Sequence, residues 1–253
     1  MKKSSCYYCG RTATSIEHVP PRCIFPERKD AFGADMRKNL ITVPSCDEHN
    51  LEKSKDDEFL MACVTPVVGN NGAGYIQTQT KLRRAFDRSD GRLLRAIMPG
   101  AKEAGVVMLG GTRFPILVGH ADMRRLCCIL EHVAHGLYFH VMKSRFIGKC
   151  HVIPNFVRSP EDPELAVIQK CARLMFQQER SNWLWCGQNP DVFRFQFGSA
   201  DQYGLYPMVM TFFQGAEVFV SFQPDGVKLP FRVLNEGTPE SPIKIEIRLQ
   251  NGS

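Results

Sequence analysis

Two short motifs near the N-terminus constrain the fold of this chain more than any other feature. Cys6 and Cys9 stand two residues apart, and after thirty-six further residues Cys46 and His49 repeat that spacing. Three thiolates and one imidazole form a complete tetrahedral set for structural zinc. The first pair ends in the turn residue Gly10, and the second pair faces one side of a predicted helical turn. We therefore predict a zinc site that stabilises the N-terminal region, because short metal-binding modules gain folding free energy from the metal.

Other interpretations of the cysteines stay open at this point. A C-x-x-C pair is also a redox motif, and the same residues describe a zinc site that no longer binds metal. Cys23 and Cys63 could replace a ligand, although neither has a partner at ligand spacing. A reducing cytoplasm argues against a disulfide framework. We expect the remaining cysteines to be small core residues, namely Cys127, Cys128, Cys150, Cys171 and Cys186.

Local signals predict the elements around the second motif. Segment 39–44 is rich in β-branched residues and predicts a short strand. Ser45 and Glu48 have the spacing of a capping box, which predicts a helix from Ser45 to about Cys63. The glycine-containing segment 65–74 then predicts a linker.

The whole chain is predicted to have an α+β fold, with a metal module over residues 1–65 and a larger α+β region over residues 66–253. Apolar residues of that region recur first at helical spacing and later with strand-like alternation, so we expect helices within 75–180 and antiparallel strands within 190–250. Segment 121–145 is apolar on all sides, which predicts a central helix. The predicted elements are helices at 75–98 (broken at Gly91), 121–145 and 161–180, and strands at 191–198 and 215–223 with a further strand-like segment between them.

Basic residues are concentrated in the middle of the chain. The net charge is +6, and residues 61–158 hold fourteen Lys and Arg against five Asp and Glu. Such a surplus suits a polyanion such as nucleic acid, although a solvated basic face has the same composition. Candidate phosphate contacts, which would position nucleic acid without reading its sequence, are Arg83, Arg84, Arg88, Arg92, Arg124 and Arg125.

Two further features concern location and the central helix. The sequence has no apolar run of about 18 residues, so we expect no membrane span. The first residues lack the apolar stretch of a signal peptide, and we therefore expect a cytoplasmic protein. His132, His135 and His140 lie on one side of the predicted central helix, and we interpret them as structural rather than as a metal or proton-relay site.

Three segments, EHVPP, NLITVPSCDEHN and KSKDD, follow the first cysteine pair in that order. Together they resemble the His-Asn-His (HNH) nuclease family, whose members have a ββα-metal fold and often carry cysteine pairs around the motif. The resemblance covers about residues 4–60, a quarter of the chain. It implies a metal-dependent endonuclease.

The resemblance also implies roles for four residues. His18 would be the general base that activates water, and Asn39 would hold the loop that carries it. Glu17 stands where members often place a carboxylate ligand of the catalytic metal. Asn50 takes the last motif position and would help to bind that metal, so the motif reads His-Asn-Asn here. Oxygen ligands favour Mg²⁺ or Mn²⁺, with water and phosphate completing the site.

Together, these expectations predict that the protein hydrolyses phosphodiester bonds, with DNA as the expected substrate. Such hydrolysis needs a base for the attacking water and a cation that stabilises the developing charge. Two other interpretations stay open. One is a nucleic-acid-binding module that keeps the zinc but has no activity. The other is an anti-phage or toxin-type nuclease subunit that acts only with a partner such as an ATPase. The sequence sets no oligomeric state.

Overall fold

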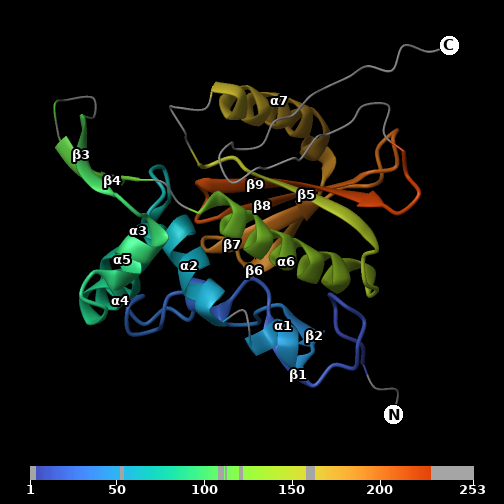
Figure 1. The fold of residues 1–253 in the computed structure, drawn as a ribbon, viewed down its shortest axis with the longest axis horizontal. Helices are drawn as coiled ribbons and strands as arrows, with labels where there is room; N and C mark the ends of the chain where they lie inside the picture. The colour runs from blue at the N-terminus through green and yellow to red at the C-terminus, as the bar shows by residue number, and fades with distance from the viewer. Residues whose placement is uncertain are drawn as a thin grey trace.

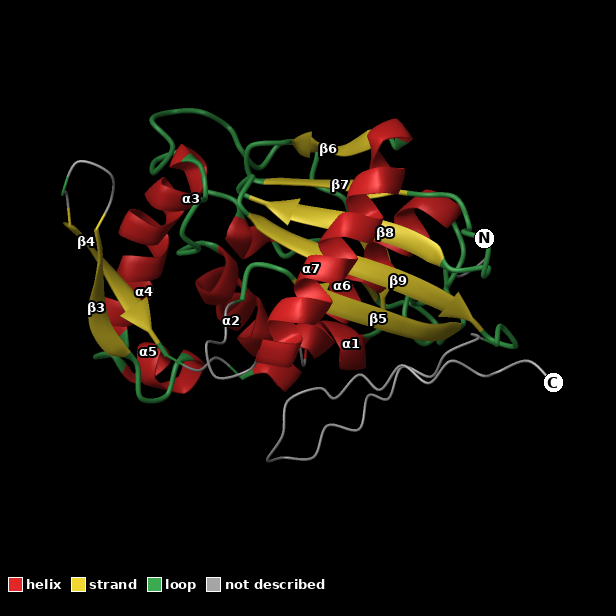
Figure 2. Ribbon diagram, turned by 90° about the horizontal axis from the view of Figure 1, so that it is seen from above, coloured by secondary structure: helices red, strands yellow, loops and turns green. Residues whose placement is uncertain are grey.

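Two long helices, α6 (Met123–Met142) and α7 (Pro163–Glu179), lie on opposite faces of an antiparallel sheet (Figures 1 and 2). The N-terminal elements pack against α6 on its other side, below it in Figure 1. Helix α6 is therefore central, as its apolar sequence predicts. This computed structural model describes residues 4–51, 54–107, 111, 113–119, 122–157 and 163–228.

The sheet has five strands in the order β5-β9-β8-β7-β6. Their bounds are β5 Gly148–Pro154, β6 Trp185–Asn189, β7 Phe193–Phe197, β8 Tyr206–Phe212 and β9 Ala216–Pro224. All neighbouring pairs are antiparallel, which confirms the predicted arrangement and the strands expected at 191–198 and 215–223. Part of the range 190–250 that was expected to be β-rich, residues 229–250, lies outside the described residues.

Alternation along β8 divides its side chains between two cores. Met208 and Met210 belong to the main core, which α6 shares, whereas Val209 packs in a smaller cluster with Ala172 of α7. The short helix η3 (Arg180–Asn182) follows α7. The main core also contains side chains of the N-terminal segment, so the module boundary predicted near residue 65 stays a prediction.

The N-terminal segment forms a two-stranded antiparallel ribbon followed by two helices. Its elements are β1 Ser15–His18, η1 Arg22–Ile24, β2 Thr42–Ser45, α1 Asp47–Leu51 and α2 Ser54–Val64. The predicted helix start at Ser45 is wrong, because Ser45 is the last residue of β2 and Glu48 forms an ion pair with Arg11 instead of a capping box. The strand expected at 39–44 begins only at Thr42, since Asn39 has a positive φ of +52°.

A group of short helices follows α2. They are α3 Gly72–Gln77, the π-helical turn η2 Thr78–Leu82, α4 Arg83–Arg88 and α5 Arg92–Ile97. The break expected at Gly91 is confirmed, and its φ is +68°. The predicted linker at 65–74 is shorter than expected, because Asn71 caps α3 and Asn70 donates to the carbonyl of Val64, the last residue of α2.

A hairpin of β3 (Lys102–Val107) and β4 (Arg113–Val118) follows these helices and has no counterpart among the predictions. Two of the cysteines expected in the core, Cys128 and Cys171, are exposed instead, because they lie on the outer faces of α6 and α7. Among the helices that the structure describes, none has both the length and the apolar character needed to cross a membrane.

Candidate metal centre and the surface around His18

Four side chains that the sequence predicts as zinc ligands meet in one place, and we call them the Cys/His cluster: Cys6, Cys9, Cys46 and His49. Their ligand atoms all lie within 4.8 Å of one another. The Sγ atoms of Cys9 and Cys46 are 3.8 Å apart. Two thiolates on a tetrahedral zinc ion, each with a Zn–S bond of about 2.3 Å, have nearly the same separation. The cluster can therefore hold a metal ion such as zinc.

Backbone hydrogen bonds place these ligands. The N–H of Cys6 donates to the carbonyl of Arg11 at 2.7 Å, and the N–H of Gly10 donates to the carbonyl of Cys6 at 3.0 Å. Gly10 closes this knuckle with φ +79°, in the left-handed region that favours glycine. Cys46 lies between β2 and α1, and its carbonyl accepts from the N–H of Asn50. The cluster therefore joins the N-terminal knuckle to the start of α1.

Two thiols of the cluster, those of Cys9 and Cys46, have pKa values shifted in opposite directions. Burial raises the pKa of Cys9, but hydrogen bonds from Arg11 and from neighbouring thiols lower it by more, to about 6. A backbone hydrogen bond from His49 lowers the pKa of Cys46, but burial and the other two cluster thiols raise it by more. The lowered pKa of Cys9 favours its thiolate form, and a bound cation would remove the repulsion that opposes ionisation of the Cys46 thiol.

Replacing Arg11 with alanine is expected to weaken zinc binding about tenfold, because Arg11 Nε donates to Cys9 Sγ at 3.4 Å and such contacts tune a ligand. Competition with a chromogenic chelator measures the change. The matched control is Glu48→Ala, which removes the ion pair of Arg11 but leaves its bond to Cys9. Equal zinc affinities in the two variants would show that Arg11 does not support Cys9.

The ring of Tyr8 connects the Cys/His cluster to α6. Tyr8 stacks on His132 with ring centroids 4.1 Å apart, and its centroid lies 4.9 Å from those of His49 and His135. Tyr8 stands between the two cysteines of the knuckle, so a metal that fixes the knuckle also fixes this ring against the central helix. The ring contacts agree with a structural role for His132 and His135.

The ribbon of β1 and β2 has one buried and one exposed face. Glu17 is 6% exposed and accepts a hydrogen bond from the hydroxyl of Tyr7 at 3.4 Å. His18 lies on the opposite face, because neighbouring strand residues alternate, and Ile16 on that face is 70% exposed. The candidate metal ligand Glu17 and the candidate base His18 are thus neighbours in sequence that point to different sides.

The two candidate asparagines lie at different ends of the ribbon. Asn50 Nδ2 donates to Ser15 Oγ at 3.0 Å, and Ser15 precedes His18 by about 10 Å along the strand. Asn39 is exposed just before β2, and no hydrogen bond within the described residues joins its side chain to the segment after His18. The structure therefore brings Asn50 to the side of the ribbon that carries Glu17. Asn39 lines a small hollow together with Val19 and Pro20, the two residues that follow His18.

The surroundings of His18 favour its neutral form. Partial burial lowers the pKa of His18 below its ordinary value of 6.5, the charge of Arg22 lowers it further, and Glu17 raises it. Arg22 is exposed at the start of η1. Arg22 was not among the residues predicted from the sequence, although its position four residues after His18 was an available signal.

Close packing fixes the end of β1 that carries His18. The N–H of Val19 donates to the carbonyl of Ile41 at 2.9 Å, which extends the ribbon beyond the strands. On α6, a Cβ added to Gly136 would lie 2.7 Å from a methyl carbon of Val19. A side chain at position 136 would therefore push the end of β1 away from α6.

Carboxylates of the protein hold two of the six candidate arginines. Arg84 donates to both carboxylate oxygens of Asp30, at 3.0 and 2.7 Å. Arg125 donates to Asp56 at 2.8 Å, and its guanidinium lies 4.3 Å from the ring centroid of Phe59. Both side chains therefore connect elements of the fold, a role that sequence analysis missed. The other four are exposed, namely Arg83, Arg88, Arg92 and Arg124.

Comparison with protein families, with curated proteins and with solved structures finds no match for this chain. Within the described residues, the Cys/His cluster is the one group of three or more Cys, His, Asp or Glu side chains arranged to hold a metal ion. A second cation at Glu17 and Asn50 would therefore depend on water and substrate for most of its ligands.

Proposed function

We propose that this chain is an HNH-type endonuclease that hydrolyses phosphodiester bonds of nucleic acid, with DNA as the expected substrate. The observation that carries the proposal is the position of His18 at the end of β1, in a strand–strand–helix unit that the Cys/His cluster joins. The quoted motifs of the resembled family fall on these elements in the same order. The lowered pKa of His18 supports a neutral base at physiological pH.

The chemistry divides between the two sites. The Cys/His cluster offers four protein ligands, so its metal has no open position for water and its role is structural. His18 takes the proton of the attacking water, and partial burial together with the charge of Arg22 lowers the pKa of that ring, which favours its neutral form. A catalytic Mg²⁺ or Mn²⁺ would supply charge stabilisation at the phosphate. Glu17 and Asn50 are the ligands that the resemblance implies; because both lie away from the face that carries His18, water and phosphate would provide most of the ligands of such an ion.

A second candidate function is nucleic-acid binding without cleavage. Two observations favour it: Glu17 and Asn50 hydrogen-bond within the protein, to Tyr7 and Ser15, and both lie away from the face that carries His18. Nicking of supercoiled plasmid by the purified full chain with Mg²⁺ or Mn²⁺ separates the two functions. Retarded migration of the DNA without nicking, in a chain that has its zinc, would support the binding module.

The pH profile of nicking is expected to fall on the acid side through a pKa below 6.5, because only neutral His18 accepts a proton and its pKa is lowered. Arg22→Ala should move this limb to higher pH, since loss of the positive charge lets the pKa of His18 rise. The measurement is the initial nicking rate across pH at saturating metal. Superimposable profiles for wild type and Arg22→Ala would contradict the assignment of the limb to His18.

A further inference from the structure

We infer that the loop joining β1 to β2, residues 19–41, presents Phe32 as a stacking platform for an unpaired base of the nucleic acid. The inference rests on the proposed function and adds a substrate class to it, a single strand or a locally opened duplex. It names a contact that the sequence motifs do not include.

Phe32 is the most exposed of the large apolar side chains among the described residues. It is 92% exposed. Its φ is +50°, in the left-handed region where a bulky side chain is an outlier, and Gly33 follows with φ +90°. Single exposed apolar residues are common on protein surfaces. An exposed aromatic ring on strained backbone is less common, because strain persists only where the surrounding structure imposes it.

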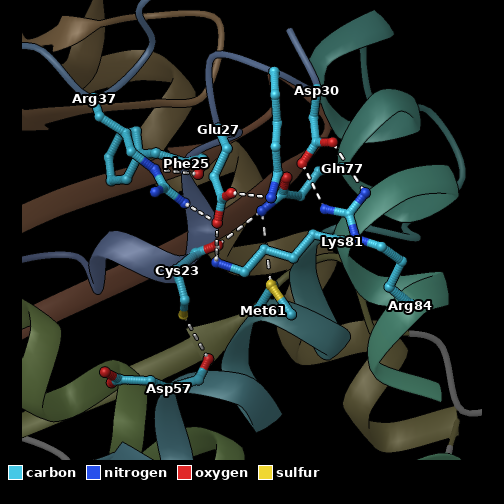
Figure 3. A network of polar contacts seen from close by, with 11 residues as sticks. Cys23, Phe25, Glu27, Asp30, Arg37, Asp57, Met61, Gln77, Lys81 and Arg84 are labelled. Carbon is cyan, nitrogen blue, oxygen red and sulfur yellow. Dashed lines mark hydrogen bonds and ion pairs between the residues drawn. The ribbon is translucent and has the colours of Figure 1, made fainter. Parts of the chain in front are cut away.

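Ion pairs join the two arms of this loop to each other and the rising arm to α4 (Figure 3). Asp30, two residues before Phe32, accepts both hydrogen bonds of the Arg84 guanidinium from α4. Arg37 on the returning arm donates to Glu27 at 3.4 Å and to the carbonyl of Phe25 at 3.0 Å. The loop is therefore fixed while its tip points into solvent, which limits the ordering entropy lost when a ligand stacks there.

The base of the loop is anchored just as firmly. Gln77, which is fully buried in α3, donates to the carbonyl of Cys23 at 2.7 Å, and Lys81 donates to the same carbonyl at 3.3 Å. Lys81 belongs to η2, and π-helical turns of this kind are frequent at functional sites. Figure 3 shows these side chains converging beneath the loop from α3, η2 and α4.

Exposed basic side chains lie on the loop near its tip and on the neighbouring helix α4. Arg28 is exposed, and its Nε donates to the carbonyl of Gly33 at 2.9 Å, which places the guanidinium beside Phe32. Lys29 is 69% exposed and pairs with Glu27 at 2.9 Å. On α4, exposed Arg88 lies one turn beyond the Arg84 that holds the loop. Asp35 is the exposed acid of the loop, and its carboxylate accepts the N–H of Arg37.

An aromatic ring among cations fits nucleic acid better than an apolar protein partner. Proteins that bind single strands combine a basic surface for the phosphates with aromatic rings on which bases stack. Bases inside a duplex offer no free face to such a ring, so the ring selects unpaired bases. The exposed Phe32 supplies the platform, and Arg28 and Arg88 supply phosphate contacts.

The test measures binding of the full chain to a fluorescein-labelled single-stranded oligonucleotide without added Mg²⁺ or Mn²⁺, so that cleavage does not interfere. Phe32→Ala is expected to weaken binding about tenfold, whereas Phe32→Trp should retain the affinity because it keeps an aromatic face. The slope of log affinity against log salt should stay unchanged in Phe32→Ala, since no charge is removed, and should decrease in magnitude in Arg28→Ala. Met175→Ala, which changes a side chain that is 63% exposed on α7, is the matched control.

Wild-type affinity in Phe32→Ala, with an unchanged melting temperature, would overturn the inference. Equal losses in Phe32→Ala and Phe32→Trp would also overturn it, as would failure of the wild type to bind the oligonucleotide. The proposed function is tested separately by nicking. Binding that depends on Phe32 in a chain that never nicks DNA would support the stacking contact and refute the endonuclease. Nicking by a chain whose binding does not depend on Phe32 would support the endonuclease and refute the stacking contact.

Discussion

Replacing Cys6 with serine is expected to abolish metal binding and to unfold the N-terminal segment. Cys6 is fully buried, and its Sγ is one of the four ligand atoms of the Cys/His cluster. Three remaining ligands cannot close a tetrahedral structural site, and the stabilisation that metal gives to such modules is large. The knuckle would lose its anchor to α1, and Tyr8 would lose its fixed position against His132 of α6. We expect a loss of unfolding free energy of about 4 kcal/mol or more.

Metal analysis of the purified protein and thermal unfolding together measure this effect. Wild type is expected to carry one zinc per chain, because the four predicted ligands form one group. Cys171→Ser is the matched control, since Cys171 is an exposed cysteine of α7 far along the chain from the cluster. Chelation of wild type should reproduce the Cys6→Ser phenotype. A fully folded Cys6→Ser protein that melts at the wild-type temperature without metal would refute a structural zinc.

The Cys/His cluster could be predicted because its signal is local. Two side chains separated by two residues can reach one ion, and this requirement leaves a readable spacing in the sequence. The break at Gly91 and the central helix α6 were predictable for the same kind of reason, since a left-handed glycine and a continuous apolar surface follow from short-range geometry.

Features that depend on distant partners were not predictable. Strand β5 pairs with β9, whose sequence lies far beyond it, and a register irregularity between Cys186 and Asn189 interrupts the alternation of β6. Ser45 and Glu48 have the spacing of a helix cap, but Glu48 instead pairs with Arg11, which follows the other cysteine pair. Tertiary contacts decided the structure at each of these positions.

The candidate site shows the same limit. The motifs predict Glu17, His18 and Asn50 as site residues, but they do not predict which face of β1 is buried. That choice depends on long-range packing, which puts Glu17 beneath Tyr7 and leaves His18 on the exposed face. The bond between Asp30 and Arg84 likewise joins the β1–β2 loop to α4, so an arginine read as a phosphate contact also fixes a loop.

Replacing His18 with alanine is expected to slow metal-dependent nicking by about a hundred- to ten-thousand-fold, the range that a positioned general base contributes. The fold should survive, because His18 lies on the exposed face of the ribbon and is not part of the buried core. The measurement is the initial rate of plasmid nicking with Mg²⁺ or Mn²⁺, with zinc content and melting temperature recorded for the same samples.

The matched control is His140→Ala. His140 is also partly buried, and burial and Lys143 lower its pKa as burial and Arg22 lower that of His18. A base assignment requires loss of nicking in His18→Ala and full nicking in His140→Ala. Nicking retained by His18→Ala with an intact fold would refute the base. The wild-type protein could prove inactive alone and nick DNA only with an added ATPase partner. His18→Ala and His140→Ala would then be compared within that complex, because the attacking water still has to lose its proton there.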